Sequence, residues 1–371
     1  MVITLSQTVK ILEGEKRFDK GNATLIPKSI AYKGARTASG EHGYVASTST
    51  LNLCGKPIER STLCSDEFPM DVTTLRVLQK IRSRSVLPQK RYGTDNAKPP
   101  RVLCMVYTSQ VSHSSKLNAI VNTWAKDCDG FFAASNLTEP CLGAADLMHN
   151  GPETYDNMWQ KVRSMWAYVY AHYIEDYDFF HICGDDTYFI ADNLRQHLWS
   201  LHHNTSKPLF LGTPMRHKGS YFAAGGPGYT LNQAAAKLLV EQALDIFLID
   251  NVDPREDVFA SSLLEKIGII LTHAMDKNGL LIYMHINPPT FVEKYSFKDN
   301  AKLLGIDKVS GATASIHVNY NRQGVGRTLY SDIDIAEVLY CYDDILKGKC
   351  DNVFQEIQAF PTSAKVVYSF F

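Results

Sequence analysis

Short apolar runs alternate with amphipathic stretches along the chain from about residue 101 onward. The runs from Arg101 to Tyr107 and from Gly130 to Ala134 predict buried strands, and Lys116 to Lys126 predicts a helix between them. Strands that alternate with helices in this way are typical of a mostly parallel sheet covered by helices. We therefore predict an α/β fold with a single Rossmann-like domain.

A third buried strand is expected from Tyr177 to Ile182, after an amphipathic helix that contains Met158. The strand leads directly into Asp185 and Asp186, and open α/β sheets place ligands at such strand ends. The alternative is that these acids cap the next helix, although Asp192 can serve as that cap. Carboxylate oxygens suit Mg²⁺ or Mn²⁺, so the pair favours a site for a divalent cation with a nucleotide diphosphate.

The first 98 residues show no sustained hydrophobic period and are broken by glycines and polar runs. We interpret residues 1–98 as a stem or weakly structured region, residues 99–350 as the folded domain and residues 351–371 as a tail. Within the stem, residues 73–87 predict a short helix. Eight Lys or Arg against one Asp between Arg76 and Arg101 indicate either a solvated linker or a membrane-surface or partner-binding patch.

Composition narrows the functional classes. Lys and Arg total 38 against 39 Asp and Glu, a net charge of −1, which argues against a nucleic-acid protein held mainly by phosphate contacts. No apolar run approaches the roughly 20 residues of a membrane helix, and the first residues lack the pattern of a signal peptide. Eight Cys, with sequons at Asn22, Asn136 and Asn204, fit an oxidising lumen without establishing one.

Two segments downstream of the acidic pair also carry candidate chemistry. Gly225, Gly226 and Gly228 lie between a predicted strand and a predicted helix. They indicate either a simple turn or a close approach of the backbone to a ligand. Glu256 and Asp257 then open another helix, where the helix dipole favours acidic residues whatever their function.

Taken in order, these segments resemble the core 1 β1,3-galactosyltransferase and Fringe branch of glycosyltransferase family 31, whose members are GT-A enzymes of the secretory pathway. The resemblance covers about residues 101–320 and implies a GT-A type domain. It is carried by Asn122-Thr123-Trp124 with Cys128, Tyr155 to Lys161, Asp185-Asp186-Thr187-Tyr188, Asp192 to Arg195, Gly225 to Tyr229, Glu256-Asp257-Val258 and Ser315-Ile316-His317.

The resemblance implies a manganese site. Asp186 falls on the position of the family's direct Mn²⁺ ligand and His317 on the position of its late histidine ligand. Asp185 is then expected to contact the donor ribose or to support the ligands. Gly184 departs from the family pattern because it removes one carboxylate of the usual D-x-D pair. His285 also resembles a family histidine and ranks second to His317.

The resemblance further implies roles in transfer. Asp257 matches the acid that serves as the family's catalytic base in a single inverting displacement. The loop with Gly225 and Gly226 is expected to border the donor sugar and the acceptor. Lys161 is expected to contact the donor phosphate or sugar, and Thr108, with the serine after it, to flank the uridine pocket.

The cysteines fit this interpretation in part. The resemblance implies a disulfide between the first strand and the first helix, and two further pairs are suggested by short separations along the chain. In that order the three pairs are Cys104 with Cys128, Cys54 with Cys64 and Cys341 with Cys350.

The sequence thus predicts a metal-dependent inverting transferase that moves galactose from UDP-galactose, in β1,3 linkage, to an α-GalNAc-Ser/Thr glycoprotein acceptor. Its expected partners are a UDP-sugar and a glycoprotein or glycan, without nucleic acid, and it works either alone or as a homodimer. The expected location is the Golgi or another secretory lumen, normally with a type II anchor that this sequence does not display. The alternatives are a Fringe-like N-acetylglucosaminyltransferase and a non-catalytic chaperone or sugar-binding relative.

Overall fold

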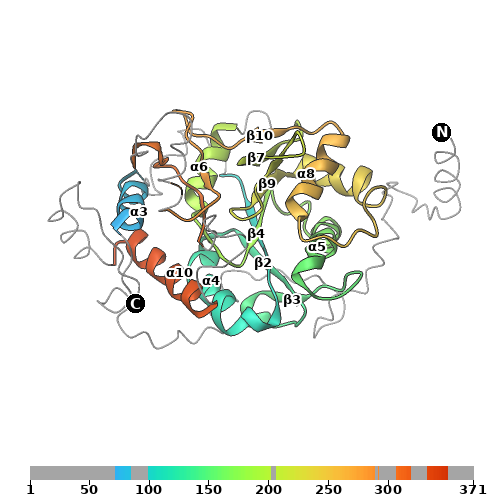
Figure 1. Cartoon of the computed structure of the whole chain (residues 1–371), viewed down its shortest axis with the longest axis horizontal. Coiled ribbons are helices and arrows are strands. Elements are labelled where there is room, and N and C mark those ends of the chain that lie inside the picture. Colours follow the sequence, from blue (N-terminus) through green and yellow to red (C-terminus); the bar gives the residue numbers. More distant parts are fainter. Residues whose placement is uncertain are drawn as a thin grey trace, which may run out of the picture.

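The computed structural model of the chain describes residues 72–84, 99–201, 206–288, 291, 306–318 and 332–349. Helices cover both faces of a central sheet, with α4, α6 and α10 on one side and α5 and α8 on the other (Figure 1). Within the described residues, no helix has the length and apolar character needed to cross a bilayer.

The central sheet has seven strands in the order β10-β6-β9-β4-β1-β2-β3. Only β9 runs antiparallel to its neighbours, β4 and β6, so the predicted mostly parallel α/β fold is confirmed. The strands are β1 Val102–Tyr107, β2 Gly130–Ser135, β3 Ala144–Asp146, β4 Phe179–Gly184, β6 Phe210–Gly212, β9 Tyr229–Asn232 and β10 Leu271–His273.

Two smaller sheets stand beside this sheet and shape its carboxyl edge. One has the order β11-β12-β5, in which β12 is antiparallel to β5 and sets His317 opposite Thr187. The other is the hairpin of β7 and β8. The strands are β5 Thr187–Phe189, β7 Pro214–His217, β8 Ser220–Ala223, β11 Tyr283–Met284 and β12 Ser315–His317.

The α-helices are α3 Val72–Arg84, α4 Asn118–Asn122, α5 Met158–His172, α6 Ala191–Leu201, α7 Gln233–Leu239, α8 Glu256–Lys266 and α10 Asp332–Leu346. Short turns of 3₁₀ helix lie at Gln110–Ser112, Trp124–Asp127, Pro140–Leu142, Tyr155–Asn157 and Ile306–Lys308. Turns of π-helix lie at His113–Leu117 and Val240–Leu244.

The helix predicted from Lys116 to Lys126 is divided rather than continuous. A π-helical turn leads into α4, and Thr123 then leaves helical geometry with φ −114° and ψ −100° before a 3₁₀ turn begins. The Thr123 hydroxyl donates to the carbonyl of Ala119 at 2.7 Å. This bond gives the buried Thr123 side chain a partner where the helix stops.

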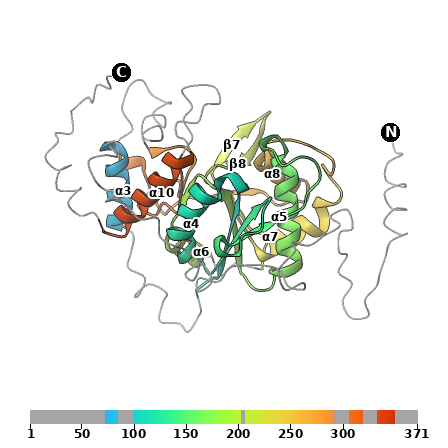
Figure 2. The same ribbon diagram turned by 90° about the horizontal axis from the view of Figure 1, so that it is seen from below.

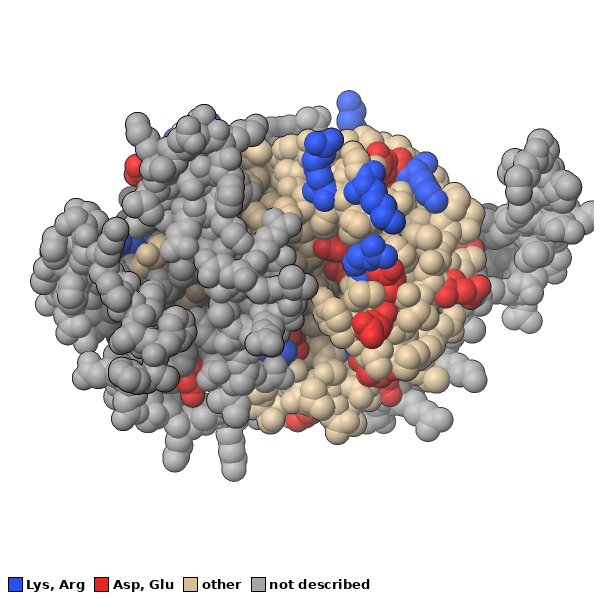
Figure 3. Space-filling model, viewed as in Figure 1, with Lys and Arg blue, Asp and Glu red and all other residues tan. Residues whose placement is uncertain are grey.

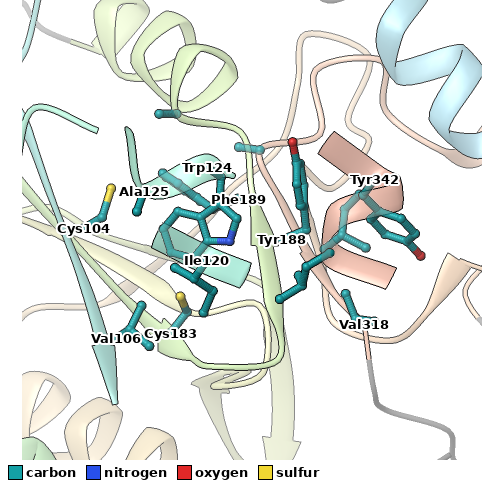
Figure 4. Close-up of a cluster of buried hydrophobic side chains, with 14 of the residues drawn as sticks. Cys104, Val106, Ile120, Trp124, Ala125, Cys183, Tyr188, Phe189, Val318 and Tyr342 are labelled. Carbon is teal, nitrogen blue, oxygen red and sulfur yellow. The ribbon is translucent and has the colours of Figure 1, made fainter. Parts of the chain in front are cut away.

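Trp124 ties this turn to the strand that follows the acidic pair. Its ring packs edge-on against Phe131 and Phe189, with centroids 5.9 and 5.7 Å away. Its indole N–H donates to the carbonyl of Thr187 at 3.0 Å. Figure 4 shows Trp124 beside Phe189 in this buried cluster. The contact fixes the start of β5, and with it the backbone next to Asp186.

The other face of the sheet carries a second apolar core. Trp159 and Trp166 of α5 are buried, and Trp166 packs between Phe180 of β4 and Tyr229 of β9. Both indole rings therefore belong to the core on this face of the sheet.

The helix predicted at residues 73–87 is α3. Val77, Leu78 and Ile81 are fully buried, and α3 packs against α10 (Figure 2). Residues 1–71, 85–98 and 350–371 lie outside the described residues, so the proposed stem and tail boundaries stay predictions.

The cysteine predictions have mixed outcomes. The disulfide between Cys104 and Cys128 is confirmed. Cys341 is a buried thiol outside any disulfide, so its predicted pairing with Cys350 is wrong. Cys341 lies within α10, where its side chain is buried. Cys141 is disulfide-bonded, which was not predicted. Cys54, Cys64 and Cys350 lie outside the described residues.

Candidate functional site

A cleft of about 780 Å³ opens at the carboxyl ends of β1 and β4. It is bordered by the loop after β8, the first turn of α8 and the end of β12. Every residue predicted for the site lines this cleft, from segments far apart in the sequence. These residues are Thr108, Lys161, Asp185, Asp186, Gly225, Gly226, Asp257 and His317.

Asp186 and His317 meet because β5 and β12 are antiparallel neighbours. The His317 Nε2 atom lies 3.2 Å from the Asp186 carboxylate, and its Nδ1 atom lies 3.3 Å from the carbonyl of His285. Burial alone would raise the pKa of Asp186, but the His317 charge and hydrogen bond hold it below its ordinary value. Burial alone would lower the pKa of His317, whereas Asp186 raises it.

These two side chains fit a divalent cation. A carboxylate oxygen beside an imidazole nitrogen is a donor set that Mn²⁺ accepts. The carbonyl of His285 can hold the His317 ring through Nδ1–H and leave Nε2 as the ligand atom, the usual support for a metal-bound histidine. Among the described residues no group of three or more His, Cys, Asp or Glu gathers for a metal. A cation here would therefore take its other ligands from substrate and water.

Gly226 makes room for the His317 ring. A Cβ atom built on Gly226 would lie 2.2 Å from the Nδ1 atom of His317, closer than atoms can approach. Gly184 is similarly confined, because its Cβ would lie 3.0 Å from Asp186 and 3.2 Å from the Tyr107 ring. Gly184 is therefore packed against the Tyr107 ring, and a larger side chain there would require these neighbours to shift slightly.

Asp185 is held by two neighbours. The Thr108 hydroxyl donates to its carboxylate at 2.7 Å, and the Lys116 ammonium lies 2.8 Å from the other oxygen. Burial raises the pKa of Asp185, although Lys116 opposes that shift. Sequence reasoning missed Lys116. Its position could have indicated it. Lys116 begins the helix predicted after the first strand, and that strand ends at the cleft.

Lys161 lies in the cleft wall between α5 and β1. Its ammonium donates to the carbonyl of Thr108 at 2.5 Å and forms an ion pair with Glu153. His149 contacts the same carboxylate at 2.7 Å. Burial lowers the pKa of Lys161, and Glu153 opposes the shift. Glu153 and His149 were not predicted, because their separation from Lys161 in the sequence matches no element that would bring them together.

Asp257 lies in the first turn of α8 and faces the glycine loop. One oxygen accepts from the backbone N–H of Gly225 at 2.9 Å. Burial raises the pKa of Asp257 above its ordinary value, while backbone hydrogen bonds oppose the rise. A carboxylate with a raised pKa is a stronger base at neutral pH.

Glu256 is the buried partner of this acid. It is 3% exposed, and the Tyr229 hydroxyl lies 3.2 Å from its carboxylate. Burial, followed by the charge of Asp257, raises the pKa of Glu256 far above its ordinary value. Two adjacent acids with environments this different favour a neutral Glu256 beside an ionised Asp257.

Comparison with known proteins shows which of them the chain resembles in sequence. No protein-family model matches the chain. A stretch of 184 residues, 48% of the chain, is 27% identical to a glycoprotein-N-acetylgalactosamine 3-beta-galactosyltransferase 1 from Xenopus laevis, over 49% of that protein. The chain is a distant relative of glycosyltransferases. Chondroitin sulfate synthase 3 from Mus musculus and from Homo sapiens each match 36% of the chain at 29% identity.

These similarities cover only part of each relative. The chain spans about half the length of the frog protein and 17% of each synthase. Their names describe a galactosyltransferase that acts on glycoprotein N-acetylgalactosamine and a synthase of chondroitin sulfate.

Proposed function

We propose that the chain transfers galactose from UDP-galactose, with inversion and in β1,3 linkage, to GalNAc linked to Ser or Thr of a glycoprotein. The observation that carries the proposal is the meeting of Asp186 and His317 in the same cleft as Asp257. Similarity to a glycoprotein-N-acetylgalactosamine 3-beta-galactosyltransferase supports the choice of donor, acceptor and linkage.

Asp257 is the proposed base. The acceptor hydroxyl gives its proton to Asp257 as its oxygen bonds to the anomeric carbon of the donor. The bond from that carbon to the diphosphate oxygen breaks, and UDP leaves with the electron pair. The N–H of Gly225 holds the Asp257 carboxylate in place, and each of its oxygens retains a lone pair for the incoming proton.

The opposite wall binds the nucleotide in this proposal. Asp186 and His317 hold a divalent cation, expected to be Mn²⁺, which when bound neutralises charge on the diphosphate. Asp185 and Lys116 lie where the ribose and phosphates enter, as an ion pair that a nucleotide can exchange for its own contacts. Lys161 supports that wall through Thr108.

A secretory lumen is the proposed compartment, with the Golgi as the first expectation. The disulfide between Cys104 and Cys128 supports an oxidising environment, because such bonds are rare in the cytosol. Asn136 also lies exposed in its sequon, where a glycosylating enzyme can reach it.

A donor screen tests the proposal. The purified chain is incubated with UDP-galactose, UDP-N-acetylglucosamine or UDP-glucose on a GalNAc-peptide, with Mn²⁺ or with EDTA. We expect galactose transfer that EDTA abolishes, and a loss of about 10²–10⁴-fold in kcat for Asp257→Asn. Asp186→Asn should lose transfer through weaker metal binding, measured directly with Mn²⁺. Asp176→Asn, an exposed aspartate away from the cleft, is the matched control.

Each alternative has its own result in this screen. Preference for UDP-N-acetylglucosamine would replace the galactosyl proposal with the Fringe-like one. No donor turnover above the Asp257→Asn background would overturn the enzyme proposal in favour of a sugar-binding protein. Transfer that persists in EDTA would remove the metal from the proposal.

A further inference from the structure

The glycine loop, residues 225–228, contacts both the candidate cation site and the proposed base. Figure 3 shows acidic side chains around a hollow in the region of β4 and α8. A Cβ atom built on Gly226 would meet the His317 ring at 2.2 Å, so the loop packs directly on that ring. The N–H of Gly225 donates to Asp257 at 2.9 Å. The position of the loop therefore helps to set the distance between the two parts of the site.

The loop is a closed turn that packs on β4. The N–H of Gly228 donates to the carbonyl of Gly225 at 2.9 Å, which closes the turn. Gly228 has a φ of 81°, and a Cβ atom on it would lie 2.1 Å from the carbonyl oxygen of Ile182 in β4. Glycine fits here because it tolerates positive φ and the strand leaves no room for a side chain. The strand therefore blocks movement of the turn in its direction.

Two buried hydroxyls hold the loop by its carbonyls. The Thr187 hydroxyl donates to the carbonyl of Gly226, and the Ser315 hydroxyl donates to the carbonyl of Pro227, each at 2.6 Å. Thr187 and Ser315 are both 0% exposed. A loop that moved away would break both bonds, and the loss of hydrogen-bond partners is costly for buried polar groups.

The strands that carry these hydroxyls also carry the candidate cation ligands. Thr187 follows Asp186 and is the register partner of His317, so the side chains of Thr187 and His317 share one face of the sheet of β5 and β12. Ser315 is two residues before His317 on β12 and lies on that face as well. This face therefore presents an imidazole ring and two hydroxyls to the glycine loop.

Building on the proposed function, we infer that Thr187 and Ser315 are positioning residues, which set the place of Asp257 relative to the cation site through the glycine loop. Neither residue lines the cleft, so neither hydroxyl acts on the substrates directly. The closed turn carries their constraint to Gly225, whose N–H holds the Asp257 carboxylate. A displacement of about 1 Å at a reacting group can cost about 100-fold in rate, so this constraint matters for proton transfer.

Variants that remove each hydroxyl test this inference in the full chain. Thr187→Val and Ser315→Ala are assayed for galactose transfer over a range of UDP-galactose concentrations, and their Mn²⁺ affinity is titrated separately. We expect kcat to fall about 10–100-fold in Thr187→Val, with KM for UDP-galactose and Mn²⁺ affinity near the wild-type values. Ser315→Ala should change kcat in the same direction. Thr187→Ser keeps the hydroxyl and should restore most of kcat.

A double-mutant cycle tests whether the effect passes through Asp257. In the Asp257→Asn background the base is already lost, so Thr187→Val should cause little further loss of kcat. Additive losses would overturn the inference, because Thr187 would then act independently of the base. A fall in Mn²⁺ affinity that matches the fall in kcat would overturn it too, because the effect would then pass through Asp186 and His317.

Thr123→Val is the matched control. It also removes a fully buried hydroxyl that donates to a backbone carbonyl, at 2.7 Å, but this hydroxyl lies at the end of α4 and not at the loop. We expect Thr123→Val to lower the melting temperature and to leave kcat near the wild-type value. A loss of kcat in this control as large as in Thr187→Val would overturn the inference, because any buried hydroxyl would then have the same effect.

Hydrogen exchange separates this inference from the proposed function. Exchange of the Gly225 amide, followed by NMR, reports its bond to Asp257 without any turnover. Faster exchange in Thr187→Val than in Thr123→Val would support the positioning role even if the chain transferred no sugar. Galactose transfer by the wild type, with kcat and exchange of the Gly225 amide unchanged in Thr187→Val, would overturn the positioning role and leave the proposed function standing.

Discussion

At the scale of single residues, the site contains a buried acid, Glu256, that takes no direct part in the proposed transfer. Glu256 lies between the Tyr229 hydroxyl and the glycine loop, and a Cβ atom on Gly225 would come within 2.7 Å of its carboxylate. A charged carboxylate in this position would repel Asp257. The neutral form instead leaves Asp257 as the charged acid of the pair, which is the form that a base requires.

Replacing Glu256 by Gln tests this assignment. Because burial raises its pKa in the folded chain, the native state keeps a proton on Glu256 that the unfolded state releases as the pH rises above the ordinary glutamate value. Its contribution to stability is thus fully present at acid pH and declines toward the raised pKa. Glu256→Gln removes that decline. We expect its melting temperature to gain on the wild type between pH 5 and pH 8.

Glu256→Ala is the contrasting variant. It leaves a cavity and removes the acceptor of the Tyr229 hydroxyl proton, so it should melt below the wild type at every pH. A Glu256→Gln chain that falls below the wild type as the pH rises would show that the glutamate is ionised in the fold.

Gly226 gives a second prediction at this scale. In Gly226→Ala the new methyl group would overlap the His317 ring, whose Nδ1 atom lies 2.2 Å away, and the ring must leave Asp186. We expect Mn²⁺ affinity to fall about 10–100-fold, as when the support of a metal ligand is removed. Gly184→Ala has milder contacts of 3.0 Å or more and should lose less. Titration with Mn²⁺ compares the two, and equal losses would contradict the assigned contact.

At the scale of elements, the sequence predicted strands better than it predicted their neighbours. β1, β2 and β4 are apolar runs, and their composition alone predicts that they are buried. Each was predicted within two residues of its observed ends. The acidic pair at the end of β4 follows from the same pattern. The sequence alone was therefore enough to place these strands and the acidic pair that follows β4.

The sequence alone did not predict which side chains from distant segments contact one another. His317 reaches Asp186 only because β12 pairs antiparallel with β5, a register that no local pattern states. The family resemblance supplied that pair. The ion pairs of Lys116 with Asp185 and of Lys161 with Glu153 had no such guide. The break at Thr123 was missed because a helical period continues across it, although the Thr123 hydroxyl bonds back to the carbonyl of Ala119 where the helix stops.

At the scale of the whole molecule, the first described helix belongs to the same core as the last. α3 packs on α10 through Val77, Leu78 and Ile81, all fully buried, in a cluster that extends to Trp124 and β5. A helix that lies within the proposed stem therefore shields apolar surface of the helical layer behind the site. How much of the chain before residue 99 the folded domain needs for its stability can therefore be measured.

Two truncations answer it. A chain that begins at residue 72 keeps α3, whereas one that begins at residue 99 exposes the face of α10 that α3 covers. Burying three aliphatic side chains is worth about 5 kcal/mol, so the shorter chain should unfold at a much lower urea concentration. Leu78→Ala in the longer chain should reproduce part of this loss, about 2–5 kcal/mol. Gln79→Ala, a partly exposed neighbour on the same helix, is its control. Equal stability of the two truncated chains would mean that α3 is dispensable and that the unit begins near residue 99, as the hydrophobic pattern alone suggests.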